Sequence, residues 1–461
     1  MTERPKLTQF RIEDGREGII HLVFDMPGRS MNVFSNAAID DIGAFARWLA
    51  TSDVRGCVVR SGKASAFCAG ADLPEIEAML DTIRATPAEE RIKVTFDHFF
   101  RLSQGLRELE TSGKPVVAAI AGLALGGGCE LALACHFRVM TTAPASVLGL
   151  PESLVGLLPG AGGTQRMPRL VGAHQALPIL LDGARFDGAA AVAAGAAHKL
   201  VPPGEEVAAA ERWILGAPDP RQPWDRPDWH PMETTAVSAG IAPQRARRMA
   251  ETHGHVPAIT AILDCVEEGL PLPIEDALAK EMDIFSRLVQ RPEPRAMIRS
   301  LFVGRVEFEK RQRTDALPQL LPLVLTAVRD ALETAEAAAR GRGANEAQIS
   351  EAKAFAGFTP SSTPSAPASP RAAAEGFWFE APGLGGELAR AAEILKAAAL
   401  ATRPYLTLVD GEAERIIDYA AITQLGFPAY TGGPLSLARR LMGPSAPYAL
   451  SGPDYRSGRT K

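Results

Sequence analysis

The chain of 461 residues contains few cysteines, and they show no grouping that would bind a metal or form a disulfide framework. The five cysteines are odd in number and widely spaced, and none belongs to a CxxC or Cys/His pattern; they are Cys57, Cys68, Cys129, Cys135 and Cys265. A zinc site or a secreted disulfide scaffold is therefore not expected. We predict that the protein holds no metal and works in a reducing, cytoplasmic setting.

Features that would indicate a membrane or a polyanionic partner are also missing. There is no run of about 20 uninterrupted apolar residues, and the N-terminal residues MTERPKLTQFRIEDG lack the apolar core of a signal peptide. The formal net charge of -5 supplies no basic field for nucleic acid or an anionic membrane. We therefore expect a soluble protein in which any phosphate-bearing ligand is held by local groups.

The length and the order of sequence patterns indicate more than one domain. A chain of this length suggests two or three domains at roughly 150 residues each. Strand and helix patterns alternate over residues 10–120, which favours an α/β core, and helical patterns dominate after residue 258. Within this helical part, residues 359–376 (TPSSTPSAPASPRAAAEG) have the composition of a mobile linker.

Residues 114–169 contain the densest chemical signal. An apolar, β-branched run at 116–120 predicts a buried strand, three glycines follow at 126–128, and small residues at helical spacing occupy 129–135. A strand that leads through glycines into a helix exposes backbone N–H groups at the positive end of the helix dipole. Such a point can stabilise negative charge that develops during a reaction.

Two carboxylates lie in apolar settings within this stretch. Glu130 falls in the first turn of the predicted helix, and Glu152 follows Pro151 in LGLPESLVGLLPG. Taken singly, Glu130 can simply complement a helix N-terminus, and Glu152 can be an ordinary acid that begins a helix after proline. Together, and beside three glycines, they favour an acid and base pair.

Three segments resemble the signature regions of the crotonase (enoyl-CoA hydratase/isomerase) superfamily. They are FCAGAD at 67–72, KPVVAAIAGLALGGGCELA at 114–132 and GLPESLVGLLPGAGGTQRMPRLVG at 149–172. RELETSGKPVVAA, LALACHFRV and QPWDRPDW are similar to the hydratase half of the bifunctional fatty-acid oxidation enzymes, which also carry a 3-hydroxyacyl-CoA dehydrogenase. The resemblance implies a crotonase-like ββα spiral over residues 5–255, a helical linker at 256–313, and a helical region at 314–461 like the C-terminal domain of the dehydrogenase.

The same resemblance implies roles for individual residues. The amides of Ala71 and Gly127 would form an oxyanion hole, while Glu130 would activate water and Glu152 would protonate Cα. FCAGAD alone would favour an ordinary strand-to-helix turn. Arg166 and Arg169 are interpreted as solvated helix charges, and the family makes a contact with CoA or with a neighbouring chain the alternative. Further substrate-binding positions implied by the family are Ala69, Gly70, Asp72, Leu73, Gly128, Pro151 and Gly160.

The implied reaction is the addition of water to a trans-2-enoyl-CoA to give a 3-hydroxyacyl-CoA, a hydro-lyase reaction of fatty-acid β-oxidation. Coenzyme A would enter only as part of the substrate. Residues 414–438 resemble the second helical repeat of the dehydrogenase, but no GxGxxG with a following acidic residue is present, and GLGGEL at 383–388 has leucine at the third glycine. We therefore expect neither NAD nor dehydrogenase activity.

Alternatives remain open at this point. An isomerase or a carbon–carbon lyase could use the same oxyanion scaffold, although retention of two carboxylates favours hydration. The chain could also be a subunit whose helical part binds a thiolase, a separate dehydrogenase or another copy of itself. We expect a homo-oligomer.

Overall fold

The computed structural model describes residues 3–64, 66–358, 379, 384 and 386–442. The chain divides into two compact units, Met1–Ala242 with Ala261–Ser286, and Pro243–Thr260 with Arg287–Lys461. Residues 261–286, which the sequence analysis assigned to the helical linker, are thus grouped with the first unit. The predicted mobile linker at 359–376 lies outside the described residues.

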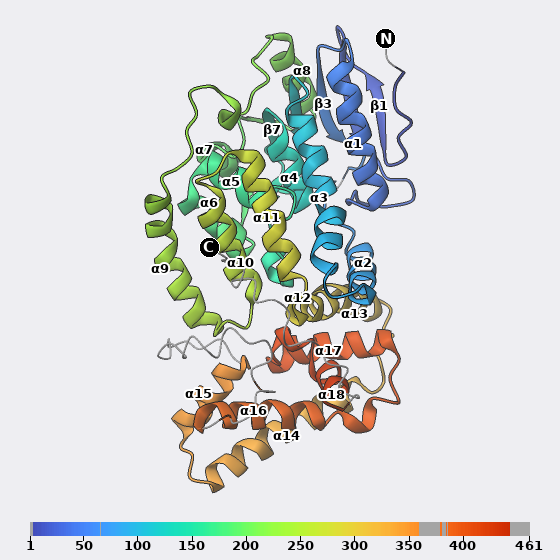
Figure 1. The fold of residues 1–461 in the computed structure, drawn as a ribbon. Coiled ribbons are helices and arrows are strands. Elements are labelled where there is room, and N and C mark those ends of the chain that lie inside the picture. The colour runs from blue at the N-terminus through green and yellow to red at the C-terminus, as the bar shows by residue number, and fades with distance from the viewer. Residues whose placement is uncertain (1–2, 65, 359–378, 380–383, 385, 443–461) are drawn as a thin grey trace. The chain divides into compact units, whose positions relative to one another are not determined.

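The first unit is built on two sheets (Figure 1). The larger sheet has the order β1 (Phe10–Asp14), β2 (Ile19–Phe24), β3 (Gly56–Ser61), β5 (Val116–Ile120), β7 (Phe137–Thr141) and β10 (Lys199–Val201). The smaller sheet has the order β4 (Ala66–Cys68), β6 (Leu123–Leu125), β8 (Val147–Gly149) and β9 (Arg185–Asp187). The β1–β2 and β8–β9 pairs are antiparallel, and the other pairs are parallel.

From β3 to β8, successive strands alternate between the two sheets, and a helix follows each pair. β3 and β4 precede α2 (Leu73–Ala85), and β5 and β6 precede α4 (Gly127–Ala134). β7 and β8 add the next strand to each sheet. The α/β class and the crotonase-like ββα repeat predicted from the sequence are therefore confirmed.

The buried strands and their covering helices follow from simple patterns. β5 is buried along its whole length, as a parallel strand covered on both faces should be. One face contacts α8 (Glu206–Leu215), where Val117 shares a core with Ala210 and Ile214. The remaining helices of this unit are α1 (Asn36–Thr51), α3 (Arg91–Glu110), η1 (Glu152–Val155), α5 (Gly163–Val171), α6 (Ala173–Asp182), α7 (Gly188–Ala194), η2 (Pro223–Asp225) and α11 (Ile274–Leu288). The helices α9 (Thr234–Thr252) and α10 (Pro257–Gly269) are each divided between the two units.

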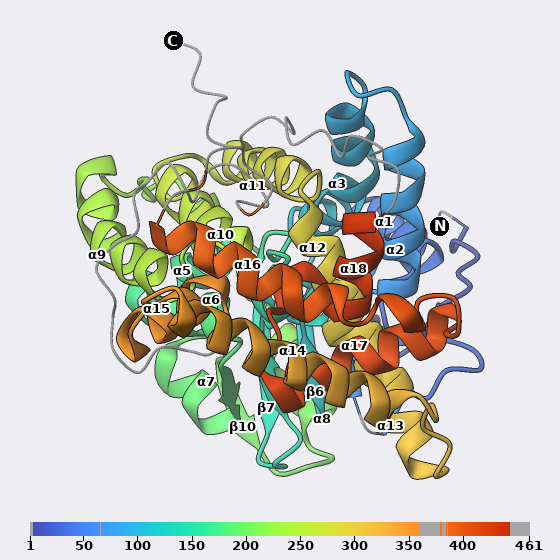
Figure 2. The same cartoon turned by 90° about the horizontal axis from the view of Figure 1, so that it is seen from below.

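The second unit is helical throughout its described residues. Its helices are α12 (Pro292–Met297), η3 (Ile298–Gly304), α13 (Arg305–Arg313), α14 (Leu321–Gly341), α15 (Glu346–Ala356), α16 (Gly386–Leu400), η5 (Arg403–Tyr405), α17 (Gly411–Leu425), η6 (Ala429–Thr431) and α18 (Pro434–Met442). α14 and α16 run side by side (Figure 2), and Val324, Leu395 and Ile417 contribute to one apolar core. The predicted helical C-terminal region is confirmed, and its likeness to the dehydrogenase domain stays a prediction.

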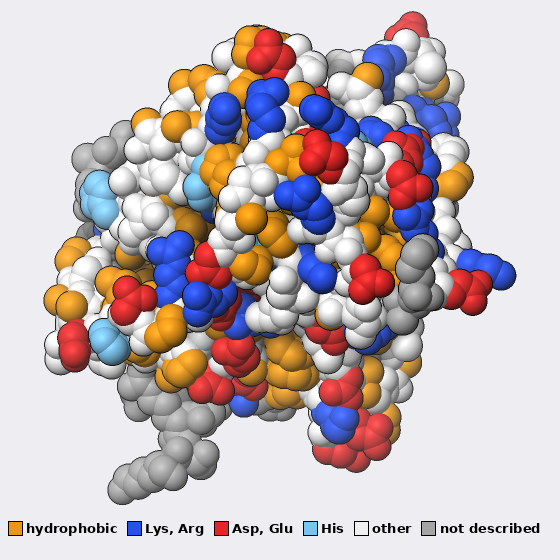
Figure 3. Space-filling model, turned by 90° about the horizontal axis from the view of Figure 1, so that it is seen from above, with side chains coloured by type: hydrophobic (Ala, Val, Ile, Leu, Met, Phe, Trp, Pro, Cys, Tyr) orange, Lys and Arg blue, Asp and Glu red, His pale blue; other side chains and the backbone are white. Residues whose placement is uncertain are grey.

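Charge and surface properties limit the kinds of site available. On the face shown in Figure 3, acidic and basic side chains are interspersed, and neither sign forms a large patch. None of the helices in the described segments has the length and apolar character needed to cross a bilayer. No group of three or more His, Cys, Asp or Glu side chains that could hold a metal ion occurs among these residues.

Candidate active site

Two strand-to-helix turns of the first unit meet at glycines. The turn after β4 contains Gly70 with φ of +109°, and the turn after β6 contains Gly126 with φ of +54°. A Cβ atom on Gly126 would lie 3.3 Å from the Cα atom of Gly70, so the two turns are in close contact. Both the backbone conformation and the available space require glycine here. The residues that follow, Ala71 and Gly127, therefore lie beside each other.

The backbone geometry leaves the N–H groups of these two residues available. Phe34 N donates to Gly70 O at 2.8 Å and Asp72 N donates to Phe34 O at 3.0 Å, so the N–H of the intervening Ala71 points away from Phe34. Gly127 is the first residue of α4, where an N–H has no partner inside the helix. Paired N–H groups at the positive end of a helix suit a developing oxyanion.

Glu130 lies in the first turn of α4 and is 3% exposed. Its Oε1 accepts hydrogen bonds from Ala161 N at 2.7 Å and Gly163 N at 2.8 Å, whereas its Oε2 accepts none from the described residues. Burial raises the pKa of this carboxyl to about 7, even though the two amide hydrogen bonds act in the opposite direction. Glu130 can therefore gain or lose a proton near neutral pH.

Glu152 is the first residue of η1 and faces the glycine turn. A Cβ atom on Gly126 would lie 3.0 Å from Glu152 Oε1, and Glu152 Oε2 is buried with no hydrogen-bond partner in the part of the chain described. Burial, followed by the negative charge of Glu130, raises the pKa of Glu152 well above its usual range. The raised pKa favours the protonated form of Glu152, which can donate a proton.

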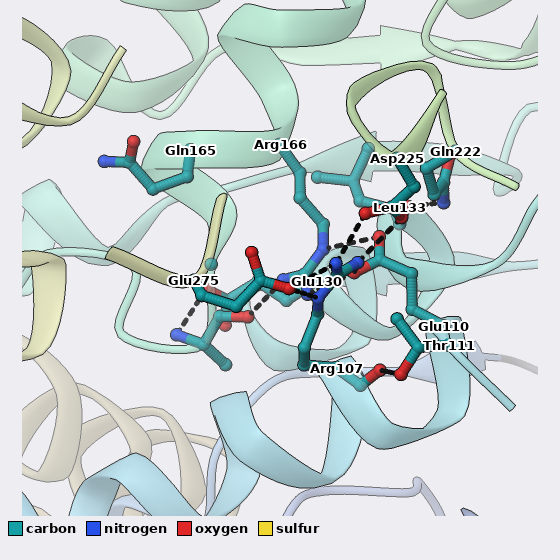
Figure 4. Close-up of polar contacts among 12 residues, drawn as sticks. Arg107, Glu110, Thr111, Glu130, Leu133, Gln165, Arg166, Gln222, Asp225 and Glu275 are labelled. Carbon is teal, nitrogen blue, oxygen red and sulfur yellow. Dashed lines mark hydrogen bonds and ion pairs between the residues drawn. The ribbon is translucent and has the colours of Figure 1, made fainter. Parts of the chain in front are cut away.

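The loop that holds Glu130 is fixed from a second side by Arg166 of α5. Arg166 Nη1 donates to Ala161 O at 2.9 Å, and its Nε and Nη2 donate to the Glu110 carboxylate at 3.1 and 2.9 Å. Figure 4 shows Arg107 and Arg166 converging on Glu110. The interpretation of Arg166 as a solvated helix charge is wrong, because the residue is 0% exposed and its charge is balanced by a buried carboxylate from α3.

Arg169, the other charge interpreted as solvated, is half-buried. Its Nη2 donates to Gly269 O and Leu272 O, both at 2.9 Å, and its guanidinium lies over the ring of Trp229. Burial lowers its pKa to about 10. Arg169 therefore connects α5 to the end of α10 and the segment that follows it. Both arginines thus make buried or half-buried contacts that hold α5 in place.

The other positions predicted to bind substrate lie around the same turns. Ala69, Ala71 and Leu73 are partly exposed, whereas Asp72 is 3% exposed. The Asp72 carboxylate accepts from Glu75 N as the cap of α2 and pairs with Arg29 Nη2 at 2.7 Å. Its side chain is thus already engaged, and only its backbone can contact a ligand.

The remaining predicted positions belong to α4 and to the segment around Glu152. Gly128 allows α4 to press against β4, since a Cβ atom there would lie 2.4 Å from Cys68 O. Pro151 directly precedes Glu152, and Gly160 precedes the loop whose amides bind Glu130. Both are partly exposed. The predicted residues thus come from one connected region, and their roles in binding stay predictions.

Another buried carboxylate, Glu281 of α11, was not predicted from the sequence. It is 0% exposed and accepts hydrogen bonds from the same loop that binds Glu130. A signal was present in EDALAKEMDIFSRLVQ, where Glu281 falls on the apolar face formed at helical spacing by Ala277, Leu278, Met282 and Phe285. An acid on such a face requires a buried partner.

Comparison with known proteins assigns this part of the chain to a family. Residues 14–216 match the family model described as "Enoyl-CoA hydratase/isomerase". This segment belongs to the enoyl-CoA hydratase/isomerase family. It includes both glycine turns as well as Glu130 and Glu152, so the matched segment and the candidate site coincide.

The enoyl-CoA hydratase/isomerase segment also has long relatives. The fatty acid oxidation complex subunit alpha of Shewanella amazonensis is 37% identical over 305 residues, which cover 65% of this chain and 42% of that protein. The protein of the same name from Idiomarina loihiensis is 34% identical over 312 residues, covering 67% of this chain and 42% of its own length. The chain thus spans about two fifths of the length of these relatives.

A solved enoyl-CoA hydratase from Bacillus anthracis is also similar. It is 22% identical, with a TM-score of 0.40, and the match covers 68% of this chain and 98% of that protein.

Proposed function

We propose that the first unit is an enoyl-CoA hydratase, which adds water to a trans-2-enoyl-CoA to give a 3-hydroxyacyl-CoA in fatty-acid or related acyl-CoA degradation. Membership of residues 14–216 in the enoyl-CoA hydratase/isomerase family supports the reaction class. The observation that favours hydration is the pair formed by the buried Glu130 and the half-buried Glu152, beside two available backbone N–H groups. Each carboxylate has one oxygen that takes no hydrogen bond from the described residues.

The oxyanion hole would act when water attacks Cβ of the enoyl group. The attack moves negative charge onto the thioester oxygen, and the N–H groups of Ala71 and Gly127 would donate to that oxygen. The N-terminal end of α4 adds a favourable dipole at the same point. One donor of this kind typically contributes a factor of about 100 to 1000 in rate.

The two carboxylates would exchange protons with water and with Cα. Glu130 is held through Oε1, so its Oε2 can accept a proton from the attacking water. The raised pKa of Glu152 favours its protonated form, which would give its proton to Cα. A positioned proton transfer contributes a factor of about 100 to 10,000. Activity is expected near neutrality, where Glu130 with its pKa of about 7 is partly ionised, and the raised pKa of Glu152 favours the protonated acid.

The proposal includes no cofactor beyond the coenzyme A moiety of the substrate. It includes no NAD and no dehydrogenase activity, because the sequence lacks a GxGxxG motif with its acidic partner. The helical second unit would then serve self-association or the binding of a thiolase or a separate dehydrogenase. The proposal for the second unit is supported only by its helical architecture and by the names of the relatives.

The test is a spectrophotometric assay of the full chain with crotonyl-CoA and longer trans-2-enoyl-CoA thioesters. Ultraviolet absorbance of the conjugated thioester should fall, and later addition of NAD should produce no NADH. Glu130→Gln and Glu152→Gln should each lower kcat by at least about 100-fold. Glu205→Gln removes an exposed carboxylate of the same unit and should leave kcat unchanged.

Two results would contradict the proposal. Full hydratase activity in Glu152→Gln would remove this residue from the mechanism. Migration of the double bond without addition of water would indicate an isomerase on the same scaffold.

A further inference from the structure

Glu281 binds the catalytic loop from the side opposite Glu130. Its Oε1 accepts from Gly162 N at 2.7 Å, and its Oε2 accepts from Thr164 N at 3.1 Å and from the Thr164 hydroxyl. Glu130 binds the two alternate amides, those of Ala161 and Gly163. Four consecutive N–H groups therefore point in turn to two carboxylates, and the loop lies between them.

This alternation makes the position of Glu130 depend on Glu281. Residues 160–162 form a turn, and Gly163 and Thr164 are the first residues of α5, where an N–H has no partner inside the helix. The two carboxylates supply these acceptors from two sides, and so fix both the turn and the start of α5. If one carboxylate is removed, two buried amides lose their acceptors, and the loop can rotate to seek others. Such a rotation would also move the amides that hold Oε1 of Glu130.

Further contacts of α11 brace the same loop. Ring atoms of Phe285 lie 3.3 Å from the position of a Cβ on Gly160, and the Phe285 ring centroid is 5.1 Å from that of Phe99 in α3. At the other end of α11, Glu275 pairs with Arg107, which also binds Glu110 (Figure 4). Glu110 in turn holds Arg166, the donor to Ala161 O. Glu281 is thus held on a helix that is itself anchored at both ends.

We infer that Glu281 is a positioning residue for the proposed hydratase, fixing the loop of residues 161–164 and through it the carboxylate of Glu130. The inference rests on the proposed function for its catalytic consequence and on hydrogen-bond geometry for its structural part. Glu281 lies beyond the family-matched residues 14–216, so the candidate site is completed by a helix outside the matched segment.

The charge of Glu281 also acts on the other carboxylates. It raises the pKa of Glu152, so loss of this charge should move the alkaline limb of the kcat/KM profile to lower pH, because Glu152 would release its proton sooner. Glu281 interacts electrostatically with titratable and charged groups from four elements. They are Glu130, Glu152, Arg166, Arg169 and the Cys265 thiol.

The experiment compares Glu281→Gln and Glu281→Ala with the wild-type chain. Asp276→Asn is the matched control, because Asp276 is an exposed acid on the same helix. Glu281→Gln keeps one acceptor oxygen and nearly the same volume, so kcat should fall by up to about 100-fold with KM little changed. In Glu281→Ala, kcat should fall further, because no acceptor oxygen remains. Hydrogen exchange of the peptide containing residues 161–164 should accelerate in both variants and not in the control.

The readouts separate this inference from the proposed function. Faster exchange at 161–164 in a chain that hydrates no enoyl-CoA would refute the hydratase and support the positioning of the loop. If the wild-type chain is an active hydratase and Glu281→Gln leaves kcat, the alkaline limb and amide exchange unchanged, Glu281 has no positioning role. Slower exchange in either variant would also overturn it.

Discussion

The buried pair of Arg166 and Glu110 gives the sharpest prediction about stability. Both side chains are fully buried, and the guanidinium makes two hydrogen bonds to the carboxylate and one to Ala161 O. Replacing Arg166 with methionine keeps most of the volume and removes the charge. Glu110 would still pair with Arg107 at 2.9 Å.

The expected magnitude follows from which charge is left without a partner. Removal of one member of a buried ion pair typically costs about 3–5 kcal/mol. Because Arg107 retains Glu110, Arg166→Met should lie near the lower limit, at about 3 kcal/mol. Glu110→Leu should lie near the upper limit of about 5 kcal/mol, because Arg166 then keeps only a carbonyl acceptor. The double variant should cost less than the sum of the two.

Denaturant unfolding followed by tryptophan fluorescence measures these values. Four of the five tryptophans, at 48, 213, 224 and 229, belong to the first unit, so the signal reports mainly on that unit. Arg47→Met is the matched control, because Arg47 is 65% exposed and pairs with Glu108, which lies on α3 as Glu110 does. This substitution should change the free energy of unfolding by at most about 1 kcal/mol. Losses below about 1 kcal/mol for Arg166→Met and Glu110→Leu would refute the reasoning.

Two further predictions concern the glycine turn and pH. Gly126→Ala should destabilise the first unit by about 1–3 kcal/mol. It should also abolish most hydratase activity, because the new Cβ would lie 3.0 Å from Glu152 Oε1. The control is Gly113→Ala, which shares a positive φ but has open space around it, so this variant should lose stability and keep its activity. The pKa of Glu281 is about 8 against an ordinary 4.5, so the folded chain holds this proton longer than the unfolded chain and loses stability as pH rises from 4.5 to 8. In urea unfolding, the free energy of unfolding of Glu281→Gln should therefore rise relative to that of wild type as the pH increases across this window. A relative free energy that falls with rising pH would contradict the pKa shift.

Local signals in the sequence were sufficient for the central elements of the site. The apolar run of β5 and the glycines at the start of α4 indicate a strand, a turn and a helix within residues 116–134, and no distant partner is needed to recognise them. Glu130 and Glu152 stood out for the same reason, as acids in apolar segments. Their position beside the two glycine turns agrees with the expectation, and their catalytic roles stay proposed.

Residues whose environment is set by distant partners could not be read in the same way. Arg166 lies 56 residues from Glu110, and α5 carries polar residues on faces that the fold nevertheless buries. A charge in such a helix looks solvated until its partner is known. Likewise, the grouping of α11 with the first unit depends on contacts with α3 and with the loop at 160–164, which periodicity alone does not reveal.

The two carboxylates that hold the loop of residues 161–164 are made at different times. Glu130 precedes its amide partners by 31 and 33 residues, whereas Glu281 follows its partners by 117 and 119. At a synthesis rate of about 5–20 residues per second, roughly 6 to 23 s separate Thr164 from Glu281 on the ribosome. A nascent chain paused in this interval would already hold both candidate catalytic acids, but half of the loop's amides would still lack their native acceptors.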